Sequence, residues 1–117
     1  MTQLQHAGFV NIYNHIARLY QDMGDLSAAS WVKWSRNNAN PMPLMLDRKL
    51  KKNSYVLRFD VTDMKAFQAL CTAMGHGTKE DTGTSRNRIE VYFNQSNNLS
   101  TILHDITVLM NFNNIMR

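Results

Sequence analysis

The hydrophobic residues change their spacing along this chain, and that change most constrains what it can fold into. Over residues 9–23 the apolar side chains recur every three or four positions, which is the spacing of one face of an α-helix. Over residues 55–61 they alternate with polar side chains, as in a strand with one buried face. Helical spacing returns at residues 64–74 and 99–112. A chain that mixes the two periods in this way predicts an α+β fold.

Local signals place the ends of the first helices. Thr2 and Gln5 have the spacing of a capping box, which predicts a helix starting at residue 3. A second helix is expected from Asp25 to Arg36, because the asparagines at 37–40 favour turns and the residue before Pro41 is driven out of helical conformation. We therefore expect an N-terminal αα-hairpin over residues 3–37.

The remainder, residues 44–117, predicts a β-hairpin, a helix, a strand and a last helix. Lys51, Lys52 and Asn53 interrupt two alternating stretches, so they form the tip of the hairpin. Thr62 or Asp63 is expected to cap the third helix and Gly75 to end it. A polar loop over 75–87, one more strand and a helix capped by Ser96 or Asn97 follow. The predicted order is ααββαβα, in one domain spanning 1–117, with a small three-stranded sheet and the helices on one of its faces.

Positive charge is concentrated in residues 31–58, which hold seven of the 13 basic side chains. Lys and Arg clusters bind phosphate backbones, and exposed Trp or Tyr can stack on bases, so this segment is a candidate nucleic-acid surface. The bland alternative is that both tryptophans lie in the core and the basic residues only solvate a surface. The candidate binding surface consists of Trp31, Lys33, Trp34, Arg36, Arg48, Lys49, Lys51, Lys52 and Arg58.

Two other polar groups of residues are candidates for binding. The outward face of the sheet is expected to carry Arg58, Arg88, Glu90 and Tyr92, where an ion pair of either arginine with Glu90 is the simpler interpretation than an RNA platform. The glycine-rich stretch 75–86 has the composition of a phosphate cradle, but its spacing is not that of a P-loop. A surface loop, which a partner could order, is the preferred interpretation.

No arrangement of residues predicts catalysis, a metal site or a cofactor. His6, His15, His76 and His104 are scattered, without a second ligand at helical spacing. Cys71 falls on the inner face of its predicted helix and is expected to be a small core residue. We therefore expect a non-enzymatic protein with neither a metal nor a cofactor.

The last helix carries apolar residues on more than one stripe. The additional ones, a candidate interface, are Val108, Phe112, Ile115 and Met116. A helix that is apolar on several sides is either buried between layers or lies in an interface. A homodimer, a groove for a hydrophobic partner and simple burial all remain open.

The absence of a long apolar stretch, an export signal or a second cysteine favours a cytoplasmic protein with no membrane association. On these grounds the first hypothesis is a small binding protein that regulates or inhibits a protein partner. The alternative is a nucleic-acid-binding regulator that uses residues 31–58.

Overall fold

The computed structural model describes residues 2–22, 44–46, 50–81 and 87–115. The chain divides into two compact units, Met1–Met42 and Pro43–Arg117. The second predicted helix, over 25–36, lies outside the described residues. The division falls between the expected hairpin and the expected α+β part, and whether 1–117 acts as one domain stays a prediction.

In the first unit, α1 spans Gln3–Asp22 and begins with the predicted capping box. The Thr2 backbone N–H donates to the Gln5 side-chain carbonyl at 2.9 Å, and the Gln5 N–H donates to the Thr2 hydroxyl at 3.1 Å. This exchange satisfies two backbone donors that a helix start leaves without partners. Phe9, Ile12 and Ile16, three members of the predicted apolar stripe, are buried.

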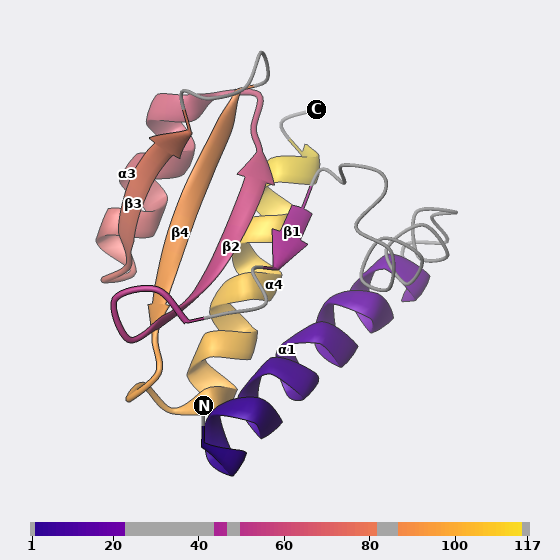
Figure 1. Cartoon of the computed structure of the whole chain (residues 1–117). Helices are drawn as coiled ribbons and strands as arrows, with labels where there is room; N and C mark the ends of the chain where they lie inside the picture. Colours follow the sequence, from indigo (N-terminus) through magenta and orange to yellow (C-terminus); the bar gives the residue numbers. More distant parts are fainter. Residues whose placement is uncertain (1, 23–43, 47–49, 82–86, 116–117) are drawn as a thin grey trace. The chain divides into compact units, whose positions relative to one another are not determined.

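The second unit is a four-stranded antiparallel sheet with two helices on the same side of it (Figure 1). Its elements are β1 (Leu44–Leu46), β2 (Ser54–Asp60), α3 (Met64–Ala73), β3 (Gly77–Asp81), β4 (Arg88–Asn94) and α4 (Leu99–Ile115). The strand order is β1-β2-β4-β3. Because β2 and β3 each run antiparallel to β4, they are parallel to each other, and α3 joins them across β4 as a split β-α-β unit. The α+β class and the single helical face are confirmed.

The sheet has one strand more than the sequence predicted. Residues 77–81 were expected to belong to a loop, but they form β3 and pair with β4 from Gly77↔Tyr92 to Asp81↔Arg88. The sequence Gly-Thr-Lys-Glu-Asp contains no apolar residue, so it lacks the alternation that marks a half-buried strand. Its conformation comes from backbone pairing with β4, which a local pattern does not reveal.

The predicted β-hairpin with a basic tip is confirmed. Lys51 and Ser54 exchange backbone hydrogen bonds of 3.0 and 2.9 Å. Between them Lys52 and Asn53 have φ values of 51° and 58°. Positive φ at both central residues is the requirement of a type I′ turn, whose twist matches that of the flanking strands.

Polar side chains and one glycine fix the ends of the helices in this unit. The Asp63 carboxylate accepts from the Ala66 N–H at 3.1 Å and caps α3. At its other end Gly75 has φ 86°, and the Gly75 and His76 N–H groups donate to the carbonyls of Thr72 and Cys71, which is a Schellman motif. α4 is capped one residue later than expected, by Asn98, whose side chain accepts from the Ser100 N–H. In the described ranges no helix combines the length and apolar character needed to cross a membrane.

The core of the second unit lies between the sheet and its two helices. The hydrophobic face of the sheet consists of the cross-strand pairs Tyr55↔Phe93, Leu57↔Val91 and Phe59↔Ile89, all buried. The Phe67 ring of α3 lies 5.0 Å from Phe59 and 6.3 Å from Phe112 of α4, centroid to centroid. Cys71 is fully buried, as predicted, and burial raises the pKa of its thiol to about 12.

The candidate interface on the last helix is described only in part. Phe112 makes its ring contact with Phe67 inside the unit, and Val108 is half-buried. The side chain of Ile115 and the whole of Met116 lie outside the described residues. Self-association through this helix stays a prediction.

Candidate functional site

The side of the sheet opposite to the helices carries a layer of paired charges. This polar face is formed by Arg58, Asp60, Lys79, Arg88, Glu90 and Tyr92, and it also includes the fully buried Val56 opposite Tyr92. The Arg58 guanidinium lies 3.1 Å from the Glu90 carboxylate, and the Tyr92 hydroxyl donates to the second oxygen of that carboxylate at 2.6 Å. The expected ion pair of Arg58 with Glu90 is confirmed. Arg88 instead binds Asp60, its cross-strand neighbour, at 2.6 Å.

The described basic residues of the candidate binding surface predicted from the sequence have partners on or beside this polar face. Of its nine residues the structure describes Lys51, Lys52 and Arg58, and the other six lie outside the described ranges. The Lys51 ammonium group lies 3.8 Å from Glu90, with its side chain 46% exposed. The exposed Lys52 places its ammonium group over the Tyr92 ring, 5.6 Å from the centroid. The aromatic side chain of the same segment in β2, Tyr55, is 4% exposed and lies in the core, so it cannot stack on a base.

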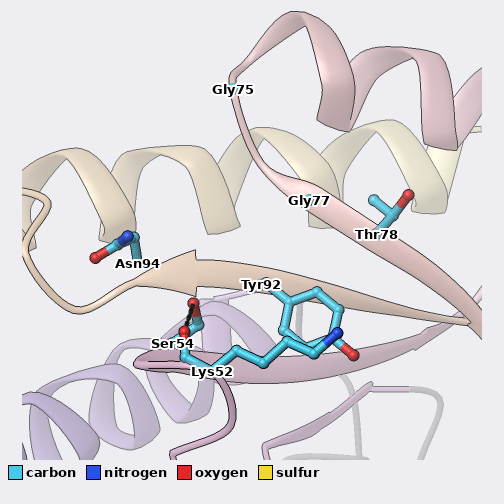
Figure 2. Close-up of a pocket in the computed structure, with 7 residues that line it drawn as sticks. All are labelled: Lys52, Ser54, Gly75, Gly77, Thr78, Tyr92 and Asn94. Carbon is cyan, nitrogen blue, oxygen red and sulfur yellow. Dashed lines mark hydrogen bonds between the residues drawn. The ribbon is translucent and has the colours of Figure 1, made fainter.

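A hollow of about 380 Å³ lies at the end of the sheet where β2 and β3 begin and β4 ends (Figure 2). It is lined by Lys52, Ser54, Gly75, Gly77, Thr78, Tyr92 and Asn94. Gly77 is the cross-strand partner of Tyr92, and it has no side chain to cover the ring. A Cβ atom there would meet the ring at 3.9 Å, an ordinary contact distance. We call this gap in the edge strand the Gly77 notch.

The hydrogen-bond alternation of the sheet determines which backbone groups β3 presents to the outside. The Val61 N–H donates to the Asn87 carbonyl at 2.8 Å, in the same register as the pairing of β2 with β4. Odd-numbered residues of β4 therefore bond to β2, and its even-numbered residues face β3. Their partners in β3 are residues 77, 79 and 81.

The intervening residues of β3, Thr78 and Glu80, consequently point their backbone N–H and C=O groups away from β4. We refer to this row of groups as the outer edge of β3. Among the described residues β3 is the last strand of the sheet on this side, and α3 lies behind it (Figure 1). The Thr78 hydroxyl accepts from the Gln68 amide of α3 at 3.1 Å, which holds the strand against that helix. The edge is thus a fixed row of hydrogen-bonding groups.

A buried histidine and aspartate form a link that the sequence did not reveal. The His76 ring Nε2 lies 2.7 Å from an Asp105 carboxylate oxygen, and the ring packs on Phe93 with the centroids 4.6 Å apart. His76 directly follows Gly75, so the Schellman motif directs it towards α4. In a Schellman motif the residue after the glycine often makes an inward hydrophobic contact. The position of His76 directly after Gly75 could therefore have suggested that its side chain is buried. Because the His76 side chain is 3% exposed, the link joins the α3–β3 turn to α4 out of reach of a bound molecule.

Loss of the aspartate is expected to destabilise the second unit. Asp105→Ala leaves a buried imidazole nitrogen without its partner, and His76 Nδ1 already has none among the described residues. We expect the free energy of unfolding to fall by about 1–3 kcal/mol in urea denaturation. His104→Ala is the matched control, because that side chain touches the same carboxylate at 3.3 Å but is 74% exposed. Its expected effect is within about 0.5 kcal/mol, and equal losses for both variants would contradict the assignment.

The Tyr92 hydroxyl is expected to titrate late. Burial, together with the hydrogen bond to Glu90 and the charge of that residue, raises the pKa of Tyr92 to about 12. An unfolded tyrosine has a pKa of about 10, so the folded state holds this proton more tightly. The resulting stabilisation is complete below pH 10 and is lost as the pH rises towards 12.

Ultraviolet absorbance of tyrosinate measures this titration, and Tyr92→Phe identifies the step that belongs to Tyr92. Glu90→Gln removes the negative charge from the hydrogen-bond acceptor and should lower the Tyr92 pKa towards 10. An unchanged pKa in Glu90→Gln would show that the two side chains are not coupled in solution.

Comparison with protein-family models, curated proteins and solved structures finds no significant match. The candidate site therefore rests on geometry alone. Over the described ranges no three or more His, Cys, Asp or Glu side chains are grouped so that they could hold a metal ion. The features brought together by the structure are the outer edge of β3, the Gly77 notch and the hollow beside Tyr92 and Lys52.

Proposed function

We propose that this chain is a non-enzymatic binding protein that regulates or inhibits a protein partner by pairing with an extended segment of it along the outer edge of β3. The observation that carries the proposal is the outward direction of the Thr78 and Glu80 backbone groups. A sheet edge of this kind is a template for another strand, and main-chain hydrogen bonds then supply much of the affinity.

The regular pairing of β3 supports this use of the edge. Proteins that block an edge strand keep it short, place proline or charged side chains there, or twist it away with a bulge. Of these devices, the short β3 carries charged residues, Lys79, Glu80 and Asp81. β3 contains no proline and pairs with β4 without a break in register over five residues. Gln68 of α3 binds Thr78 from behind, so a partner strand meets an edge that is already ordered. Such pre-organisation reduces the entropy cost of association.

The electrostatics of the polar face also favour a polypeptide as the partner. Nucleic-acid binding depends on cations that neutralise phosphates. On this face Arg58 and Arg88 are held by the carboxylates of Glu90 and Asp60, and Lys51 also lies near Glu90. Because the Arg58 and Arg88 side chains are only 20% and 8% exposed, they are poorly placed to neutralise phosphates, which leaves a polypeptide as the preferred partner. Holding that segment extended would deny it to other binders, which is how the domain would regulate or inhibit.

Replacement of Glu80 by proline tests the proposal. Glu80→Pro removes an outward N–H without removing a bond to β4, whereas Glu80→Ala removes the charge but keeps both backbone groups. We expect capture of the partner from a nuclease-treated host lysate, with identification by mass spectrometry, to fall about tenfold or more for Glu80→Pro only. Equal capture by both variants would overturn edge pairing.

Amide hydrogen exchange provides a second measurement on the unmodified chain. In the free protein the Thr78 and Glu80 amides should exchange faster than the Lys79 amide, which faces β4. Binding of the captured partner should then slow Thr78 and Glu80 selectively. Exchange that does not change on binding would contradict the proposal even if Glu80→Pro proved unable to fold.

The nucleic-acid alternative stays a prediction, and the exposed lysines at the hairpin tip favour it. Lys51 and Lys52 lie at the type I′ turn, and the Lys52 ammonium group lies over the Tyr92 ring. If this alternative is right, binding of labelled DNA or RNA should weaken steeply with salt, and the double change Lys51→Glu/Lys52→Glu should abolish it. Absent or salt-independent binding at low ionic strength would exclude this use of the tip.

A further inference from the structure

We propose that the hollow behind the Gly77 notch is a subsite for an Asp or Glu side chain of the partner segment. The inference rests on the proposed pairing along β3 and names the chemistry that would give it specificity. Residues that face each other in neighbouring strands lie on the same side of a sheet. The residue of an added strand opposite Gly77 would therefore point to the polar face, where Gly77 has no side chain in its way.

Beyond the Gly77 notch lie the Tyr92 ring, which forms the floor of the hollow, and the Lys52 ammonium group. Gly77 is paired with Tyr92, so a side chain crossing above the glycine reaches the tyrosine ring next. The Lys52 ammonium group lies over that ring, 5.6 Å from its centroid (Figure 2). The bond of the Tyr92 hydroxyl to Glu90 fixes the ring, so the floor of the hollow is in place before anything binds. A guest of two or three side-chain carbons would bring its end group to Lys52.

The lining side chains of Asn94 and Lys52 suit an anion. Asn94 lies at the end of the hollow with its side-chain carbonyl accepting from Ser96, so its NH2 group is the part that can donate to an anion, whereas the Ser54 hydroxyl donates to the Lys52 carbonyl. Of the described residues that line the hollow, Lys52 is the charged one, and the neighbouring Glu90 already accepts from Arg58 and from the Tyr92 hydroxyl. The Lys52 ammonium group is complementary in charge to a carboxylate. A basic or purely apolar side chain would bury Lys52 without a compensating charge, which costs free energy.

The size of the hollow is also suitable. At about 380 Å³ it falls within the range for ligand pockets and is large enough to admit one Asp or Glu side chain. The subsite would give the edge sequence specificity, because backbone hydrogen bonds alone do not distinguish one sequence from another.

A random peptide library selected on the full chain tests the subsite. We expect the selected peptides to carry Asp or Glu at one fixed position, and to bind about tenfold or more weakly to Lys52→Glu. Replacing that acidic residue by lysine should restore binding to Lys52→Glu. Lys65→Glu makes the same charge change on the exposed surface of α3 and serves as the matched control, with affinity expected to be unchanged.

Filling the Gly77 notch with a side chain is an independent test of the subsite. Gly77→Val places a side chain in an ordinary strand conformation, with its Cβ in normal contact with Tyr92, so the fold should tolerate it. The variant should lose the preference for the acidic residue while it keeps the residual binding of a peptide in which that residue is alanine. Retention of the acidic preference would overturn the subsite.

The outcomes separate the two proposals. Peptides that lose binding to Glu80→Pro but show no acidic preference and ignore Lys52→Glu would overturn the subsite and leave edge pairing intact. Peptides insensitive to Glu80→Pro, or a library that yields no specific binder, would overturn edge pairing and the subsite that depends on it. Binding that is abolished by amidating the peptide C-terminus would assign the hollow to a terminal carboxylate and overturn the side-chain assignment.

Discussion

The antiparallel pairing of β2 with β4 is the constraint on which the rest of the second unit depends. Seven residue pairs in one unbroken register, from Ser54↔Asn94 to Asp60↔Arg88, turn alternate side chains to opposite faces. One face becomes a continuous apolar layer that the helices cover, with Phe67 of α3 packed on Phe59. A shift of one residue would exchange the two faces, so burial of the apolar layer holds the register in place.

The same register arranges the polar face and the edge. Arg58 meets Glu90 and Arg88 meets Asp60 because the pairing places each arginine opposite a carboxylate. It also directs the backbone N–H and C=O groups of the even-numbered β4 residues towards β3, where they bond to residues 77, 79 and 81. The backbone groups of Thr78 and Glu80 therefore point outwards. The proposed binding edge is therefore a consequence of the central pairing, and it should keep its geometry as long as the core does.

Two glycines connect the core to the candidate site. Gly75 adopts a φ of 86°, which closes α3 in a Schellman motif and turns the chain so that His76 meets Asp105 of α4. Gly77, two residues later, begins β3 and leaves the Tyr92 ring uncovered. The turn thus performs two tasks within three residues, because it anchors the start of the edge strand to α4 and opens the notch beside the hollow.

The sequence by itself determined the features that depend on neighbouring residues: the α+β class, the capping box of α1, a cap of α3 at Thr62 or Asp63, the Gly75 stop and the hairpin with a basic tip. It also indicated that Arg58 or Arg88 would pair with Glu90, since alternation in two strands places all three on one face, and the structure selects Arg58. The existence of β3, the Asp60–Arg88 pair and the His76–Asp105 link became evident only in the tertiary structure. The reason is physical. Periodicity and capping are local, whereas an edge strand without apolar residues and a side-chain hydrogen bond across 29 positions exist only through partners that folding brings near.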